Sequence, residues 1–219
     1  MSDARTEILS RIRTALGTST PEPAAVAAAV PRDYRSGGEH APGSEVVLDL
    51  LVDRLEDYKA HVHRVTSAGL PALLARLLAE VPASSVVVPA GAEPGWLGAL
   101  DGVDVRSDSR DAPLSATELD GIDAVVTAAR VAVAETGTIV LDGESDQGRR
   151  AISLVPDVHV CVVRTDQVVQ TVPEAVRLLD ADPGRPLTWI SGPSATSDIE
   201  LDRVEGVHGP RTLHVALVS

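Results

Sequence analysis

The sequence predicts an α/β fold in which a mostly parallel sheet is flanked by helices. Short apolar runs rich in valine, such as residues 84–90 and 159–163, are typical of strands covered on both faces. They alternate with segments whose apolar residues recur at helical spacing, and this alternation favours a parallel sheet. The 219 residues are 44% hydrophobic and 2% aromatic, with no Phe, so we expect one compact domain with a core of Val, Leu, Ile and Ala.

The first 43 residues are predicted to form an arm. Asp3 can cap a helix that ends at Gly17 and has apolar residues at helical spacing: Ile8, Leu9, Ile12 and Leu16. The stretch that follows is rich in Pro, Ala and Gly, which is typical of a linker. The α/β domain is therefore expected over residues 44–219. To bury its apolar stripe, the helix must pack on that domain or on a partner chain.

The elements of the domain can be placed by period and by end signals. In chain order, the first half is predicted to contain a helix at 44–60, a strand at 61–65, a helix at 70–81, a strand at 84–90, a short helix at 95–100 and a strand at 103–106. The second half is predicted to contain a brief helix capped by Ser115 and Glu118, two strands within 122–142 that meet around 128–135, a strand at 159–163, a helix whose first turn pairs Thr171 with Glu174, and strands at 187–190 and 212–218.

Charge and cysteine content exclude several classes of function. The formal net charge is −13 with no run rich in Lys or Arg, which argues against nucleic acid and anionic membranes as partners. No segment has the length of a signal peptide core or a membrane span, so we expect a cytoplasmic protein. The single cysteine, Cys161, lies in an apolar run and is expected to be a buried hydrophobe. One cysteine can form neither a disulfide within the chain nor a four-thiolate iron–sulfur site.

A polar stretch of about twenty residues separates the last two predicted strands, which both look central to the sheet. Because ligands bind outside the carboxyl ends of parallel strands, the residues after the first of these strands are candidates for ligand binding: Gly192, Ser194, Thr196, Asp198 and Glu200. The hydroxyls and a helix start near Ser197 can cradle an anion, or they can form an ordinary helix cap. His208 is a candidate catalytic group because it titrates near neutral pH, or it is a turn residue. The spacing of acids and histidine matches no closed metal motif, so no metal is predicted.

Two further segments carry candidate site residues. In "AVAETGTIVL", Glu135 stands among apolar neighbours and is a candidate general base or nucleophile, with possible substrate contacts from Thr136, Gly137 and Thr138. The alternative is an exposed hairpin tip. Arg149 and Arg150 follow a segment rich in acids and Gly, and they can bind a carboxylate or phosphate, or balance nearby acids. No phosphate-binding glycine fingerprint is present, which argues against dinucleotide and ATP sites.

The segments "AVAETGTIVL", "RRAISLVPDVHVCVV" and "SGPSATSDIELDRVEGVHGPRTLHVALV" resemble the LUD-domain family. The resemblance covers about residues 44–219 and implies a fold similar to the NagB/RpiA/CoA-transferase-like superfamily. It also implies a role in oxidising L-lactate to pyruvate as a carbon source, beside two iron–sulfur partner proteins. The family pattern often has a basic residue where this sequence has Ala195. Arg149 or Arg150 is therefore the expected anion-binding residue in this chain. The resemblance supplies no established catalytic residue. The candidate residues are therefore chosen for their chemistry at positions that match the family.

The resulting hypothesis is a cluster-free accessory component of an L-lactate-oxidising system, with iron–sulfur clusters held by partner proteins and no cofactor in this chain. The alternative is a stand-alone transferase or isomerase that binds a carboxylate or phosphate metabolite at Glu135, Ser194, Asp198 and His208. A third reading is a scaffolding module with a vestigial pocket. The proposed site requires the polar turns to converge on one pocket at one edge of the sheet. Without that convergence, only the pathway role implied by the resemblance remains.

Overall fold

The computed structural model describes residues 4–17, 33–193 and 209–219. The chain divides into two compact units, residues 1–35 and residues 36–219. In the first unit, helix α1 (Ala4–Leu16) confirms the predicted N-terminal helix, and Gly17 ends it with a φ of 62°. The predicted apolar stripe of this helix is exposed: Ile8, Leu9, Ile12 and Leu16. Residues 36–43, predicted as part of the arm, lie in the second unit, where the Gly43 N–H donates to the Val168 carbonyl at 2.9 Å.

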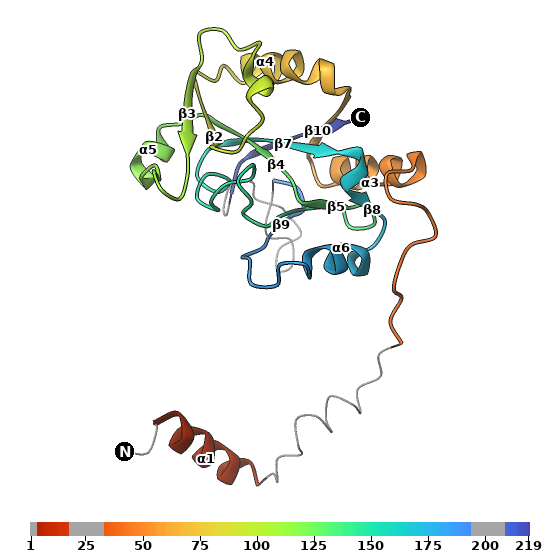
Figure 1. The fold of residues 1–219 in the computed structure, drawn as a ribbon, viewed down its shortest axis with the longest axis vertical. Helices are drawn as coiled ribbons and strands as arrows, with labels where there is room; N and C mark the ends of the chain where they lie inside the picture. Colours follow the sequence, from red (N-terminus) through yellow and green to blue (C-terminus); the bar gives the residue numbers. More distant parts are fainter. Residues whose placement is uncertain (1–3, 18–32, 194–208) are drawn as a thin grey trace. The chain divides into compact units, whose positions relative to one another are not determined.

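The second unit is built on a six-stranded sheet in which every neighbouring pair is parallel (Figure 1). Its order is β1-β10-β7-β4-β2-β3. The strands are β1 (His61–Val65), β2 (Ser85–Pro89), β3 (Asp104–Asp108), β4 (Ala124–Ala128), β7 (Val158–Arg164) and β10 (Thr212–Val218). The predicted fold class, a mostly parallel α/β sheet flanked by helices, is confirmed. The central strands are almost wholly buried, as their continuous apolar sequences predict.

A second sheet of four strands was not predicted. It has the order β8-β5-β6-β9 and consists of β5 (Val131–Val133), β6 (Thr138–Leu141), β8 (Val168–Val169) and β9 (Thr188–Ile190). The prediction of two strands within 122–142 was wrong, because this stretch holds β4, β5 and β6. The chain changes sheets at Ala129 and Arg130, a break of two residues inside a long and mostly apolar stretch. The prediction that 187–190 is a central strand was also wrong: β9 is an edge strand, and Trp189 on it is 43% exposed.

Four helices cover the sheets of the second unit within its described residues: α3 (Glu45–Asp57), α4 (Leu70–Glu80), α5 (Ala116–Asp120) and α6 (Val172–Leu179). Single turns of 3-10 helix occur at η1 (Ser67–Gly69), η2 (Pro94–Leu97) and η3 (Thr165–Gln167). Both predicted capping pairs form, Ser115 with Glu118 in α5 and Thr171 with Glu174 in α6. The short helix predicted at 95–100 is the 3-10 turn η2. No helix in the described part of the chain has both the length and the apolar character that crossing a membrane requires.

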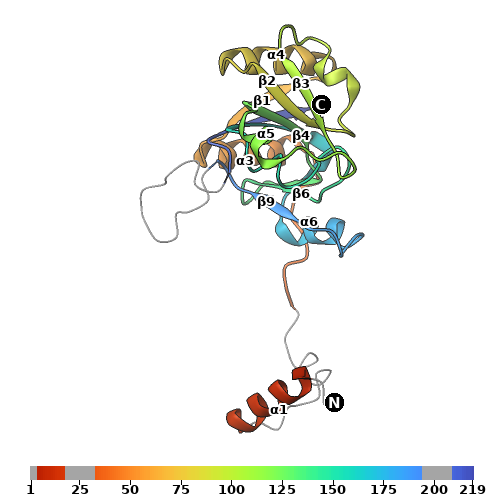
Figure 2. The same ribbon diagram turned by 90° about the vertical axis from the view of Figure 1, so that its left-hand side faces the viewer.

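The core consists of layers. Leucines of α4 pack on one face of the six-stranded sheet, while α3 and the inner face of the second sheet pack on its other face. Helix α6 covers the outer face of the second sheet. Figures 1 and 2 show this order, with α4 at the top of the unit and α6 below β9. Cys161 is fully buried in the layer under α3, as predicted, and burial raises the pKa of its thiol to about 12.

Candidate functional site

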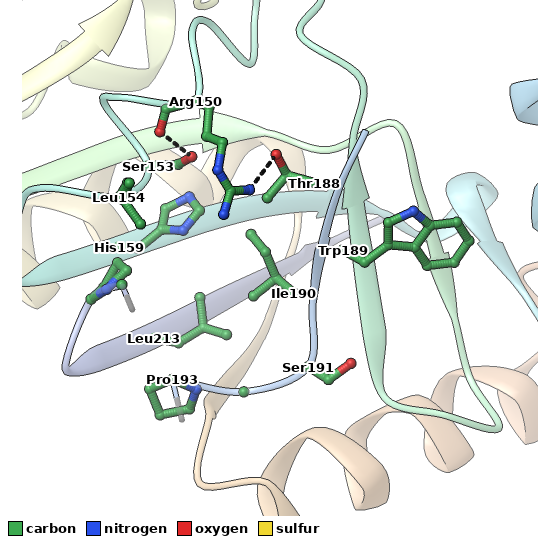
Figure 3. Close-up of a pocket in the computed structure, with 13 residues that line it drawn as sticks. Arg150, Ser153, Leu154, His159, Thr188, Trp189, Ile190, Ser191, Pro193 and Leu213 are labelled. Atoms are coloured by element: carbon green, nitrogen blue, oxygen red, sulfur yellow. Dashed lines mark hydrogen bonds between the residues drawn. The ribbon is translucent and has the colours of Figure 1, made fainter. Parts of the chain in front are cut away.

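A cavity of about 360 Å³ opens where β9 leaves the second sheet and where β7 and β10 begin (Figure 3). It lies at the amino ends of β7 and β10, so the expected position at the carboxyl ends of the large sheet does not hold for this cavity. The described residues that line it are Arg150, Ser153, Leu154, His159, Thr188, Trp189, Ile190, Ser191, Gly192, Pro193, Gly209, Pro210 and Leu213.

Arg150 supplies the positive charge of the cavity. Its Nη1 donates a hydrogen bond to Thr188 Oγ1 at 3.0 Å, and this contact aims the guanidinium between β9 and the turn that precedes β7 (Figure 3). Ser153 Oγ donates to the Arg150 carbonyl at 3.2 Å, which fixes the turn that carries both residues. A guanidinium has five N–H donors, so the bond to Thr188 leaves donors for an anionic ligand. The cavity can therefore bind a carboxylate or phosphate group.

His159 points into the same cavity from the start of β7 (Figure 3). The residue is 1% exposed, and burial lowers the pKa of its imidazole to about 4. Its Nε2 lies 2.8 Å from Thr127 Oγ1 on the neighbouring strand β4, and this contact fixes the ring orientation. A neutral imidazole at pH 7 can donate or accept a hydrogen bond without adding charge, and it can accept a proton from a bound ligand.

The predicted Glu135–Thr138 segment is the turn between β5 and β6, and it lies beside the exit of β9. Thr138 Oγ1 is 2.8 Å from Ser191 Oγ, and Thr136 Oγ1 donates to Thr138 Oγ1 at 2.8 Å. The Glu135 side chain is directed elsewhere, because Gln170 Nε2 donates to its Oε1 at 3.2 Å. None of these four residues is among the described residues that line the cavity. The structure thus brings the turn to the edge of the cavity without placing its carboxylate inside.

Two candidate glycines hold this region against the end of α3. Gly137 has a φ of 57°, and a Cβ there would lie 2.9 Å from Arg54 Cβ. Gly192 has a φ of 76°, and a Cβ there would collide with the Tyr58 carbonyl oxygen. Both positions combine a left-handed backbone with close packing, so each requires glycine. Gly192 also lines the cavity, whereas the role of Gly137 is to let the β5–β6 turn approach α3.

The two adjacent arginines have different environments. Arg149 makes a bidentate pair with Asp108 at the end of β3, with Nε to Oδ2 at 2.9 Å and Nη2 to Oδ1 at 2.5 Å. Its Nη2 also donates to the Leu114 carbonyl at 3.0 Å. The hydrogen bonds that Arg149 donates to Asp108 raise the pKa of Arg149, and the Asp108 side chain is fully buried. Arg149 therefore balances a nearby acid, which was the alternative to ligand binding, whereas Arg150 faces the cavity.

The remaining candidates, Ser194, Thr196, Asp198, Glu200 and His208, lie outside the described residues. The residues on either side of that gap, Pro193 and Gly209, both line the cavity. In the described ranges, no group of three or more His, Cys, Asp and Glu side chains is arranged to hold a metal ion.

Sequence reasoning missed His159, Ser153, Thr188 and Ser191. His159 interrupts an apolar strand, and a buried polar residue in such a run signals either a satisfied hydrogen bond or a site. The three hydroxyl residues stand in unremarkable loop and edge positions. The pairing of β9 with β6 brings Thr188 and Ser191 to the cavity, and this pairing joins residues about fifty positions apart.

The comparisons with known proteins define the class to which this chain belongs. The family model described as the LUD domain matches residues 48–218. The chain therefore belongs to the LUD-domain family, in agreement with the predicted resemblance.

Relatives and a solved structure narrow the comparison further. The chain is 50% identical over its whole length to "Lactate utilization protein C" of Deinococcus radiodurans, and it covers 97% of that protein. A protein of the same name from Bacillus subtilis is 34% identical over 100 residues, which cover 43% of this chain and 41% of that protein. The crystal structure of a DUF162 family protein from Deinococcus radiodurans matches with a TM-score of 0.67 and 47% identity. That match covers 80% of this chain and 97% of the other.

Proposed function

We propose that this protein acts in lactate utilization, as a cluster-free accessory component of a cytoplasmic system that oxidises L-lactate to pyruvate. The observation that carries this proposal is the full-length match, at 50% identity, to a protein named Lactate utilization protein C. The iron–sulfur clusters of such a system are expected in partner proteins.

The state of the single cysteine supports the cluster-free role. Thiolates, not thiols, bind iron–sulfur clusters, and the usual set is four. Cys161 is the one cysteine of the chain, it is fully buried in β7, and its pKa is about 12. Electron transfer in the proposed system is therefore assigned to its partners.

The cavity at Arg150 is the proposed place for a small carboxylate ligand. A carboxylate can take guanidinium N–H groups of Arg150. The volume of about 360 Å³ is near the lower limit of ordinary small-molecule pockets, which suits a metabolite of a few carbon atoms. His159 can then contact the part of the ligand next to the carboxylate.

Growth of the native host tests the role. Deleting the gene should abolish growth on L-lactate as the sole carbon source and leave growth on pyruvate intact. Complementation with Arg150→Gln should restore growth poorly, whereas the matched control Arg76→Gln should restore it fully, because Arg76 pairs with Glu80 on α4 at the surface. Iron–sulfur proteins should co-purify with the tagged protein. Normal growth of the deletion strain on L-lactate would refute the proposal.

The alternative is a stand-alone transferase or isomerase acting on a carboxylate or phosphate metabolite. The observation that favours it is the buried neutral imidazole of His159 in one cavity with Arg150. The purified protein alone should then turn over such a compound, and His159→Gln should reduce the turnover more than a hundredfold while the protein stays folded. If the protein alone shows no turnover and turnover appears once the partner proteins are added, this alternative is rejected and the accessory role is supported.

A further inference from the structure

A second cavity, of about 230 Å³, adjoins the cavity at Arg150 and shares Arg150, Ser153 and Thr188 with it. Three arginines and no acid line the second cavity within the described part of the chain, although the whole chain has 32 acidic side chains and 19 basic ones. Positive charge gathered in one hollow of an acidic protein indicates a site for an anion. The lining residues are Arg110, Leu141, Gly143, Gln147, Gly148, Arg149, Arg150, Ser153, Pro186, Leu187 and Thr188.

Arg110 brings an unused guanidinium to this cavity. It follows β3, it is exposed, and its side chain makes no ion pair or hydrogen bond with the described residues. The adjacent Asp111 does not line the cavity. Gly143 has a φ of 72°, and a Cβ there would lie 3.4 Å from Arg110 Nη2, so the guanidinium lies close to the backbone of this glycine. All five N–H donors of Arg110 therefore remain for a ligand.

The acids bonded to the lining residues, or next to them in the loop, are paired with other arginines. Asp108 holds Arg149 by two hydrogen bonds, so the charges of these two residues offset each other. Asp142 and Glu144, on either side of the lining glycine, both pair with Arg185. The positive charges of the other two lining arginines are therefore not balanced by these acids.

The loop that forms one wall of the second cavity is held in place by its own contacts. Gln147, which is 3% exposed, accepts a hydrogen bond at Oε1 from the Asp142 N–H at 2.7 Å. The Gly148 N–H donates to the Glu144 carbonyl at 2.8 Å. A Cβ on Gly148 would lie 2.6 Å from Ile152 Cδ1, so the loop is also packed closely. A wall that is ordered before binding loses little entropy when a ligand arrives.

We propose that the second cavity binds a phosphate dianion, either as free phosphate or as the phosphate group of a metabolite whose organic part extends into the cavity at Arg150. Arg110 and Arg150 supply two positive charges, which match the charge of about −1.5 to −2 that a phosphate monoester carries at pH 7. The planar guanidinium fork also fits two phosphate oxygens at once. The cavity lies below the size range of drug-sized ligand pockets, which suits one small group. This inference does not rest on the proposed function, because Arg110 lies outside the cavity assigned to a small carboxylate.

Isothermal titration calorimetry of the full-length protein, in a phosphate-free buffer at pH 7.5, tests the inference. We expect inorganic phosphate to bind at one site per chain, and acetate, a monoanion, to bind at least roughly tenfold more weakly. Glycerol 3-phosphate distinguishes the two sources of the phosphate group. It should bind more tightly than inorganic phosphate if the ligand is a phosphate ester, and no more tightly if the ligand is free phosphate. The absence of saturable phosphate binding would overturn the inference, as would equal binding of acetate.

Variants assign the binding to the proposed contact. Arg110→Gln removes an exposed side chain without described partners, so the protein should stay folded, and phosphate binding should weaken roughly tenfold to a hundredfold. Arg110→Lys keeps the charge and loses the fork, so its affinity should lie between the two. The matched control is Arg106→Gln, also on the β3 segment, where Arg106 pairs with Glu118 at the surface.

The control variant should bind phosphate as tightly as the unsubstituted protein. Equal weakening by Arg106→Gln and Arg110→Gln would indicate a general effect of surface charge and would overturn the inference. Unchanged binding in Arg110→Gln would do the same. Growth on L-lactate is a separate readout, so either proposal can fail without the other.

Discussion

Thr138 Oγ1 and Ser191 Oγ lie 2.8 Å apart, and this contact joins the β5–β6 turn to the point where β9 leaves the second sheet. Ser191 is one of the residues that line the cavity at Arg150. The contact therefore connects the "ETGT" motif, whose carboxylate faces away from the cavity, to the wall of the cavity itself.

The first prediction follows from this contact. Thr138→Val keeps the shape of the side chain and removes the hydroxyl, so it should lower the free energy of unfolding by about 1 kcal/mol, the usual net value of one hydrogen bond. Urea denaturation of the purified protein measures this change. Ser107→Ala, an exposed position on β3, is the control and should change stability by less than about 0.5 kcal/mol. Equal effects of the two substitutions would show that the contact contributes nothing to stability.

Arg149 and Arg150 should respond differently to the same substitution. Arg149→Gln leaves the carboxylate of Asp108, whose side chain has no exposed surface, without its charged partner, so the free energy of unfolding should fall by about 3–5 kcal/mol. Arg150→Gln should change it by less than about 0.5 kcal/mol, because Arg150 is exposed. Chemical denaturation of both variants gives the comparison. The prediction fails if the Arg150 variant is as unstable as the Arg149 variant.

Stability should fall as the pH drops from about 6.5 to 4. Burial lowers the pKa of His159 to about 4, below its ordinary value of 6.5, so between these values the unfolded chain binds a proton that the folded protein does not. The contribution of His159 is complete above pH 6.5 and is lost as the pH falls toward 4, by an amount on the order of 3 kcal/mol. Part of the slope comes from His214, whose pKa is also lowered by burial to about 4.

Urea unfolding at pH 7.5 and pH 5 measures this dependence. His159→Gln should reduce the loss of stability between the two pH values, because one of the two buried imidazoles is removed. His40→Gln changes an exposed histidine and should leave the pH dependence as it is in the unsubstituted protein. An unchanged slope in the His159 variant would mean that the pKa of His159 is the same in the folded and unfolded states.

Local signals in the sequence predicted much of this fold. The pairs Ser115–Glu118 and Thr171–Glu174 are separated by three residues, so their capping boxes could be identified without knowledge of tertiary contacts. Continuous valine runs likewise indicated buried parallel strands. The second sheet was missed because its strands have two to four residues each and only Ala129 and Arg130 separate β4 from β5.

The candidate site could be predicted only in part, because its geometry depends on long-range pairing. Arg150 and Gly192 were identified from residue type and do line the cavity. The partner of Arg149 is Asp108, 41 residues earlier, and Gln170, which binds Glu135, is 35 residues later. No local pattern indicates either contact. Which edge of the sheet holds the cavity also depended on the placement of β9, which its sequence alone did not reveal.

The last prediction concerns Gly137, where a left-handed backbone and close packing coincide. At Gly137 an added Cβ would lie 2.9 Å from Arg54 Cβ and 3.0 Å from the Arg54 carbonyl carbon, whereas at Gly102 the φ of 69° is similar and no atom lies within 4 Å. Gly102→Ala therefore measures the backbone penalty alone, of about 1 kcal/mol. Gly137→Ala should cost roughly 1–3 kcal/mol more, because α3 and the β5–β6 turn must separate. Thermal and urea unfolding of the two alanine variants give this difference directly. Equal destabilisation would mean that the turn does not depend on its close approach to α3.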